Sequence, residues 1–136
     1  GTEKVILLVD SANLQINGNI NVTDGSGFFM ALVGKTATGT MGNINVAATV
    51  GGAAPQANPN LEGIYESDGI FNDTAANIQL WVRGSVVANG GVSLLRDLVA
   101  GNATTPAELF EYAPDQILLY PPKLGVRKLN WKEVAP

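Results

Sequence analysis

The sequence contains no cysteine and no histidine, and charged residues make up only 15% of its 136 positions. These absences exclude disulfides, thiolate chemistry, histidine-based catalytic triads and zinc sites of the usual Cys/His kind. The formal net charge of −4 also disfavours a nucleic-acid partner. The apolar run Val5–Val9 is too short to cross a membrane, so we expect no membrane insertion by this segment.

Glycine and asparagine are abundant instead, with 16 glycines and 13 asparagines in a chain of single-domain length. Apolar and polar residues alternate over residues 13–17, 43–46 and 79–86. A period of two indicates half-buried strands, and in the last of these Leu80 and Val82 share one face. Asn-Gly, Asp-Gly and Gly-Gly pairs lie between such segments and accept the positive φ of sharp turns.

Short strands separated by glycine turns suit either a sandwich or barrel of hairpins or a β-solenoid. Internal repeats favour the solenoid, because each copy reads apolar pair, polar or glycine corner, apolar pair, Asn/Gly corner. The copies can be anchored on Val9, Val33, Tyr65 and Val82, which are unequally spaced along the chain. We therefore predict an all-β fold, a right-handed β-solenoid (β-helix) of about 4–5 short turns over residues 1–97.

The composition agrees with stacked turns. Small residues suit corners that lie one above another, stacked asparagines can form hydrogen-bond ladders, and stacked like charges would repel. Residues 47–60 are rich in Ala, Gly, Pro and Asn, and we expect them to leave the coil as a loop insertion.

The character of the chain changes after Asp97. We predict that residues 98–136 form a segment of the same domain that caps the last turn or packs along the side of the coil. Residues 105–112 suit either a short helix or a strand, and residues 114–120 suit one short helix. Residues 129–134 alternate like a strand.

Charge is divided unevenly along the chain. Residues 1–122 contain four basic and eleven acidic residues, whereas residues 123–136 contain four basic residues and one acid. The basic tail could dock on an acidic surface of this chain or of a neighbour, or it could lie solvated with little effect.

Carboxylates and basic side chains are the main candidates for chemistry in a chain without histidine and cysteine. Glu62, Glu66, Asp68 and Asp73 lie close in the sequence, and Arg83 follows on the next predicted turn. Such a patch resembles the acid-and-base sites of polysaccharide-cleaving β-helices. Solvated corner residues would explain the same pattern without any activity.

Aromatic residues suggest a second kind of site. Alternation places Trp81 on the outward face, where it could form a platform for sugar rings with Tyr65 and Phe71. Alternatively, Trp81 lies under the C-terminal segment, near Trp131 or Tyr112.

The predicted site is therefore a binding site without catalytic residues. Its members are Glu62, Glu66, Asp68, Trp81 and Arg83. We predict no metal and no cofactor, because turn chemistry explains the Asp-Gly pairs and the glycines form neither GxGxxG nor a P-loop.

Several motifs carry a resemblance to a known class of proteins. They are Gly63-Ile64-Tyr65 with Asp68-Gly69, Leu80–Gly91, Leu94–Leu98, Thr105–Phe110 and Trp131–Pro136. Over most of residues 5–136, the chain resembles the C-terminal β-solenoid domain of uncharacterised surface proteins of candidate-phyla (Patescibacteria-type) bacteria. It is also similar to PilX-like pilus-associated β-helical domains. The resemblance implies an extracellular or envelope protein and supplies no catalytic residues.

Together these observations favour a non-enzymatic structural or adhesive domain, extracellular or at the cell surface, that presents a rigid β-solenoid. The expected partners are a second copy stacked end to end at Val5–Val9, upstream domains of a longer chain, or a surface glycan. The chain starts at Gly1 without methionine, and we expect it to be a piece of that longer chain. The alternative function is a carbohydrate-binding or polysaccharide-cleaving β-helix.

Overall fold

The computed structural model describes residues 1–122. Strands account for most of the regular structure of these residues, with one short α-helix and one 3₁₀ helix. In chain order the elements are β1 (Lys4–Val9), β2 (Leu14–Ile16), β3 (Phe28–Val33), β4 (Ile44–Val46), β5 (Leu61–Ser67), β6 (Phe71–Asp73), β7 (Leu80–Ala88), β8 (Val92–Ser93), η1 (Val99–Ala103), β9 (Glu108–Glu111) and α1 (Pro114–Leu118).

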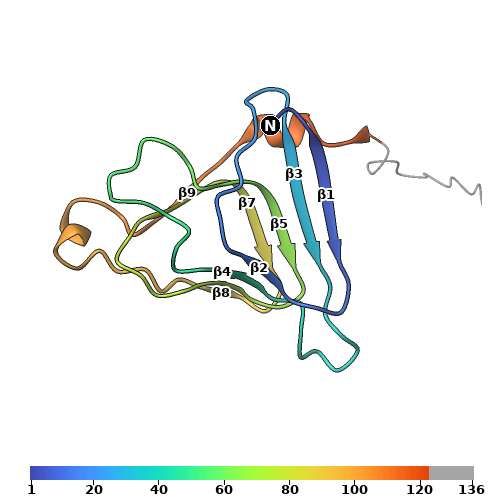
Figure 1. Cartoon of the computed structure of the whole chain (residues 1–136). Coiled ribbons are helices and arrows are strands. Elements are labelled where there is room, and N and C mark those ends of the chain that lie inside the picture. Colours follow the sequence, from blue (N-terminus) through green and yellow to red (C-terminus); the bar gives the residue numbers. More distant parts are fainter. Residues whose placement is uncertain (123–136) are drawn as a thin grey trace, which may run out of the picture.

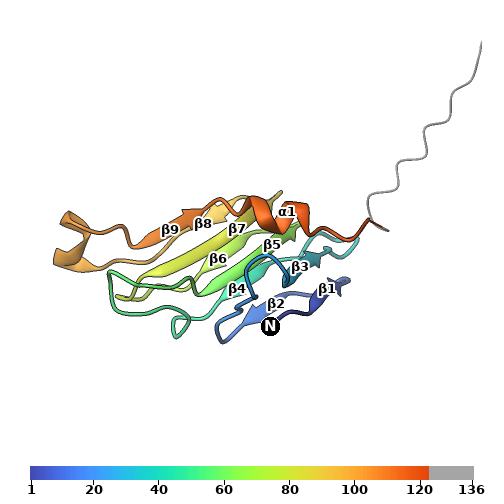
Figure 2. The same ribbon diagram turned by 90° about the horizontal axis from the view of Figure 1, so that it is seen from above.

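The strands form two parallel sheets that wind around a common axis. The larger sheet has the order β1-β3-β5-β7-β9, and the smaller sheet has the order β2-β4-β6-β8. The chain passes from one sheet to the other in every turn, so each strand pairs with its counterpart one turn later (Figure 1). Figure 2 shows the turns stacked from β1 and β2 at one end to β8 and β9 at the other. The predicted all-β solenoid is confirmed, with one turn for each of the four strands of the smaller sheet.

Two glycines bend the long strands β5 and β7 and give the coil three walls. Gly63 has a φ of +135° and Gly84 a φ of +148°, which residues with a Cβ rarely adopt. Before its bend, β7 pairs with β9 through Leu80–Arg83, and after its bend β5 pairs with β3 through Ile64–Ser67. We call the part of β5 and β7 before the bend, with β9, the first wall. The second wall contains β1, β3 and the later halves of β5 and β7, and the smaller sheet is the third wall.

The register of the strands corrects two of the predicted repeat anchors. The expected stacking of Val33 on Val9 is confirmed, because the two residues pair. The second step is wrong, because Val33 pairs with Ser67 and not with Tyr65. The third is also wrong, because Tyr65 pairs with Val86 and not with Val82. The second anchor was two residues out of register on the same wall, since Tyr65 pairs with Ala31. The third failed because the glycine bends place Val82 on the first wall and Tyr65 on the second.

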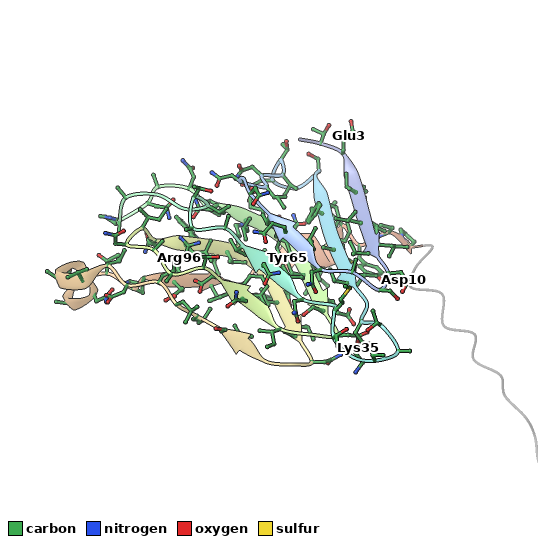
Figure 3. All side chains as sticks on the ribbon, turned by 60° about the horizontal axis from the view of Figure 1, so that its bottom comes forward. Glu3, Asp10, Lys35, Tyr65 and Arg96 are labelled. Atoms are coloured by element: carbon green, nitrogen blue, oxygen red, sulfur yellow. The ribbon has the colours of Figure 1, made fainter. Side chains whose placement is uncertain are left out.

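Apolar side chains from successive turns stack into one continuous core inside the three walls. Tyr65 is fully buried there, and its ring lies 5.7 Å from Phe29 and 6.4 Å from Phe71 between centroids (Figure 3). The Tyr65 hydroxyl donates a hydrogen bond to the main-chain oxygen of Glu62 at 3.2 Å. Burial, with a smaller effect of the Glu62 charge, raises the pKa of Tyr65 far above its ordinary value, so the hydroxyl stays a donor.

Asparagines stabilise the corner before the third wall through bonds to the main chain, in place of the expected ladders between their side chains. The Oδ1 atom of Asn13 accepts hydrogen bonds from the main-chain N–H groups of Gly42 and Asn43 one turn later, at 3.0 Å each. Asn43 Oδ1 in turn accepts the N–H of Ile70 at 2.8 Å. The amides thus bind the backbone of the next turn and help to satisfy the N–H groups of the corner.

The long connection over residues 47–60 contains no strand of its own. It is nevertheless attached to the coil, because Val50 is fully buried in the core and Gly52 forms an antiparallel bridge with Gln79. The connection therefore extends from the coil as a fixed arm beside the first wall.

The last described residues first extend the coil and then run along its side. β9 is the fifth strand of the larger sheet and lies on the first wall, so this sheet continues beyond residue 97. α1 then packs back toward the first turns, where the buried Gln116 donates to the main-chain oxygen of Gly27 at 3.2 Å. The ring of Tyr120 meets Phe28 edge-on at 6.0 Å. The expected strand at 129–134, the basic tail and the contact with Trp131 lie outside the described residues.

Candidate functional site

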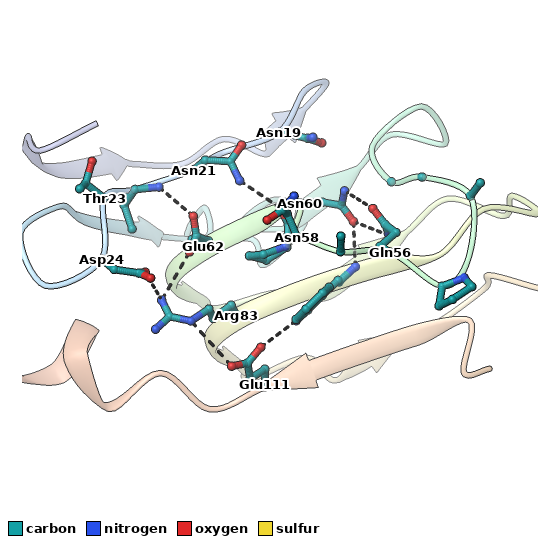
Figure 4. A pocket seen from close by; sticks show the side chains of 18 residues that line it. Asn19, Asn21, Thr23, Asp24, Gln56, Asn58, Asn60, Glu62, Arg83 and Glu111 are labelled. Atoms are coloured by element: carbon teal, nitrogen blue, oxygen red, sulfur yellow. Dashed lines mark hydrogen bonds and ion pairs between the residues drawn. The ribbon is translucent and has the colours of Figure 1, made fainter. Parts of the chain in front are cut away.

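A groove lies on the outside of the first wall (Figure 4). Its volume is about 1130 Å³. Its floor is the first wall, and its sides are the connection 51–60, residues 19–24 and the end of β9. The side chains that give it polar and aromatic character are Asn19, Asn21, Thr23, Asp24, Gln56, Asn58, Asn60, Glu62, Trp81, Arg83 and Glu111.

Arg83 lies at one end of the groove, surrounded by four carboxylates. Asp115 accepts two hydrogen bonds from its guanidinium, at 2.8 and 3.3 Å. Asp24, Glu62 and Glu111 lie at 3.3, 3.4 and 3.8 Å from guanidinium nitrogens. Burial acts to lower the pKa of Arg83, but the Asp115 hydrogen bond and the surrounding negative charges raise it above its ordinary value. The groove therefore holds a permanent cation within a net negative cluster.

Glu62 is the most enclosed of these four carboxylates. Its Oε2 accepts the main-chain N–H of Val22 at 2.9 Å, and its Oε1 accepts from Arg83 at 3.4 Å. Only 7% of its side chain is exposed. Glu62 thus joins the loop of residues 19–24 to the first wall and holds Arg83 in position.

Trp81 presents its ring to the groove in a fixed orientation. Its indole N–H donates to Oε2 of Glu111 at 3.1 Å, and its main-chain N–H donates to Oδ1 of Asn60 at 2.9 Å. Asn60 and Gln56 exchange amide hydrogen bonds of 2.8 and 3.0 Å. This network attaches the arm of residues 51–60 to the indole-bearing strand, so the groove is preformed.

The structure brings together three of the five predicted site residues, namely Glu62, Trp81 and Arg83. Glu66 and Asp68 lie elsewhere, beside a smaller hollow of about 370 Å³ on the second wall. The prediction grouped Glu66 with Glu62 because the two lie close in the sequence. The bend at Gly63 separates them, because the strand turns from the first wall to the second between the two residues.

Asp68 and the two aromatic residues that were expected to join Trp81 also lie outside the groove. Asp68 accepts hydrogen bonds from the Lys35 N–H at 3.2 Å and from the Asn89 amide at 3.2 Å, which is the role of a corner residue. Tyr65 and Phe71 are fully buried in the core, so they cannot form a sugar platform with Trp81.

Sequence reasoning missed Asp24, Glu111 and Asp115 as neighbours of Arg83. Glu62, Arg83 and Glu111 occupy one column of the first wall, because Glu62 pairs with Arg83 and Arg83 pairs with Glu111. The alternation of charge along this column was the available signal, and it required the correct register. Asp24 and Asp115 reach the site from a loop and from α1, which no periodicity indicates.

A second cluster of charged side chains is buried between the third wall and the connection before β9. The side chains of Arg96 and Asp73 are fully buried, and Arg96 Nε lies 3.4 Å from Asp73 Oδ2. The Arg96 guanidinium also donates to the main-chain oxygens of Ala47 and Ala48 at 2.9 and 3.3 Å. Glu108 accepts the main-chain N–H of Arg96 at 2.7 Å. These contacts join the connections that precede β5 and β9 to each other and to strands β6 and β9.

The groove can act as a binding site that combines an aromatic ring, amide donors and acceptors, and a charged end. Within residues 1–122, no group of three or more acidic side chains is arranged to hold a metal ion. The same residues include no helix with the length and apolar character needed to span a bilayer. No protein-family model, curated protein or solved structure matches the chain.

Proposed function

We propose that this chain is a non-enzymatic adhesive domain, extracellular or at the cell surface, whose rigid β-solenoid binds a glycan in the groove of the first wall. The observation that carries the proposal is the preformed groove in which Trp81 lies beside a row of amide side chains and the Arg83 cluster. The surface location rests on the resemblance to bacterial surface proteins.

The side chains of the groove have the chemistry that a sugar requires. Hydroxyl groups donate and accept hydrogen bonds, and carboxamides offer both functions on one planar group. Five carboxamides line the groove: Asn19, Asn21, Gln56, Asn58 and Asn60. Gln56 and Asn60 bond to each other, so we expect Asn19, Asn21 and Asn58 to bind the sugar. The apolar face of a sugar ring can stack on an indole, and Trp81 supplies one.

The contacts of the carboxylates favour binding over cleavage. A general acid or base must have an atom free to exchange a proton with the substrate. Both carboxylate oxygens of Glu62 are engaged by Val22 and Arg83, and Glu111 is held by Trp81. Asp24 and Asp115 compensate the same guanidinium. These contacts give the four carboxylates a role in positioning Arg83 and Trp81, which favours binding over cleavage.

The solenoid suits an adhesive role because hydrogen bonds join its backbone to the neighbouring turns throughout the coil. Successive strands pair through parallel ladders, and asparagine side chains add bonds at the corners. A groove on such a scaffold needs little ordering when a ligand binds, which favours affinity.

The proposal is tested by measuring binding of the whole chain to a panel of soluble polysaccharides, with Trp81→Ala as the variant. Loss of the ring should weaken binding about tenfold, which corresponds to about 1.4 kcal/mol. Tyr112→Ala is the matched control, because Tyr112 is exposed outside the groove. Circular dichroism establishes that both variants keep the β fold.

Two results would overturn the proposal. One is that no polysaccharide of the panel binds. The other is that Trp81→Ala binds as well as Tyr112→Ala. If the polysaccharide is shortened during incubation, the domain is an enzyme, and the non-enzymatic assignment is wrong.

A further inference from the structure

Both ends of the coil leave strand edges without a partner among the described residues. At the first end these edges are β1 and β2, and at the other end they are β8, β9 and the later half of β7. Exposed edges are usually protected by charge, proline or a covering segment. β1 carries one charge, Lys4 at its start, and no proline, and the Leu8 side chain is 71% exposed.

Each end of the coil has an incomplete turn, and the walls missing at one end are those present at the other. β9 pairs with β7 only through Leu80–Arg83, so the fifth turn has a first wall and lacks the second and third walls. The first turn starts with the second wall, as β1, and continues to the third, as β2. The step at the far end is a hollow of about 450 Å³, lined by Gly84, Ser85, Val86, Val92, Phe110, Glu111 and Tyr112. The β1 and β2 strands of a second copy would supply the two missing walls.

The side-chain columns of the second wall would continue across such a junction with similar residues. Leu7, Ala31, Tyr65 and Val86 form one inward column. One further step in the same register places Leu7 of a second copy on Val86. This contact would cover apolar surface that is only half-buried at each end, which is favourable.

The third wall would continue in the same way. Its inward column ends at Val92, which is 51% exposed, and would receive Leu14 of the second copy. Its outward column contains Gln15, Asn45, Asn72 and Ser93. The next residue in that column would again be Gln15, so polar side chains would remain outside.

Charges are also compatible with this junction. At the corner after the second wall the column reads Asp10, Gly34, Asp68 and Asn89, so no two carboxylates are adjacent within one copy. Asp10 of a second copy would follow Asn89, which keeps the carboxylates apart. Stacked like charges would repel, and this order avoids them.

We propose that copies of this chain stack head to tail, with β1 and β2 of one copy pairing in parallel with the free edges of β7 and β8 of the next. The two surfaces differ, so the contact does not close on itself and each addition leaves a new free end. The occupant of each end is therefore a second copy of this chain, and the product is a continuous solenoid.

A cysteine pair tests this register directly, because the chain contains no cysteine of its own. In the stacked form, Ser93 and Gln15 of neighbouring copies would lie on adjacent strands, about 5 Å apart and within disulfide reach. Within one copy the same residues are three strands apart, roughly 14 Å, which is too far. Mild oxidation of the double variant Ser93→Cys, Gln15→Cys should therefore give a ladder of disulfide-linked chains.

Two controls make the result specific. An equal mixture of the two single variants should give mainly cross-linked pairs of one Ser93→Cys chain and one Gln15→Cys chain. The double variant Asn72→Cys, Gln15→Cys should form little ladder, because its cysteines remain two strands apart in the stacked form. Equal laddering of this control and the matched pair would show random collision and overturn the proposal.

Sedimentation of the unmodified chain at rising concentration provides an independent readout. We expect the boundary to shift from monomer to dimer and longer species, and Val92→Lys should abolish the shift while preserving the circular dichroism spectrum. A chain that remains monomeric throughout, with no Ser93–Gln15 cross-link, would overturn the proposal. Trp81→Ala should assemble normally, so a failure of glycan binding and a failure of stacking are distinguishable.

Discussion

Single buried charged residues hold the connections of this coil in place. Arg96 is the clearest case, since its fully buried guanidinium bonds to the main-chain oxygens of Ala47 and Ala48 and lies beside Asp73. A buried guanidinium without partners would be strongly unfavourable, and these partners compensate its desolvation. The local sequence around Arg96 gives no sign of this role, because burial of a charged residue depends on connections that come from distant turns.

We expect Arg96→Met to destabilise the protein by about 3–5 kcal/mol, because it leaves the Asp73 carboxylate buried without its partner. Urea unfolding followed by circular dichroism measures this loss. Lys35→Met is the matched control, because Lys35 lies at an exposed corner, and it should change stability by less than about 0.5 kcal/mol. Equal effects of the two substitutions would contradict the structural role of Arg96.

Glu108 predicts a pH dependence of stability. Burial raises the pKa of Glu108 above its ordinary value of 4.5, and the Asp73 charge adds to this, while the Arg96 N–H and guanidinium act in the opposite direction. The folded protein therefore binds the Glu108 proton more tightly than the unfolded chain does. Its contribution to stability is present at low pH and is lost as pH rises from 4.5 through the folded pKa.

The substitution Glu108→Gln removes this titration. The difference in unfolding free energy between the variant and the parent should therefore increase in favour of the variant as pH rises through that window. Urea titrations at a series of pH values measure it. Glu66→Gln, an exposed glutamate of β5, controls for the loss of one negative charge. A difference that stays constant with pH would contradict the prediction.

At the scale of elements, the alternation of apolar and polar residues correctly predicted strands, but it could not predict where the strands bend. The alternating segments at residues 13–17 and 43–46 are strands β2 and β4, and the longer one at 79–86 lies largely in β7. Alternation cannot show that β7 changes walls at Gly84, since a bend does not alter the order of apolar and polar residues. Residues 108–111 illustrate a second limit, because pairing with β7 decides between the strand and helix that the sequence allowed.

The bend at Gly84 predicts that a side chain at this position destabilises the protein. A Cβ at Gly84 would overlap the main-chain oxygen of Gly63, and φ is +148° there. Gly84→Ala should therefore cost at least about 2 kcal/mol of stability through clash and backbone strain. Gly18→Ala is the control, because a Cβ at Gly18 has no atom within 4 Å. Thermal unfolding of the two variants should separate them clearly, and similar melting temperatures would mean that the bend tolerates a side chain.

At the scale of the whole molecule, the site and the C-terminal segment depend on contacts between distant residues. The groove forms where residues 19–24 and 51–60 extend beside the first wall, and neither its depth nor its members follow from any local pattern. Glu62, Trp81 and Arg83 could be predicted because outward residues of neighbouring turns share a wall. Glu66 and Asp68 were grouped with them only because they are close in sequence, and the glycine bend separates them.

The contacts of the segment that contains Gln116 and Tyr120 lead to a prediction about the rate of unfolding. Tyr120 packs on Phe28, and Gln116 bonds to the sequence-distant Gly27, so this contact can form only after the turns between them have stacked. Tyr120→Ala should lower stability by about 1–2 kcal/mol, a factor of roughly 5–30. Nearly all of this should appear as faster unfolding with little change in refolding, since late contacts are absent from the transition state. Stopped-flow kinetics in urea measures both rates, with Tyr112→Ala as an exposed tyrosine control. Slower refolding of the Tyr120 variant would mean that the segment docks early and helps to nucleate the coil.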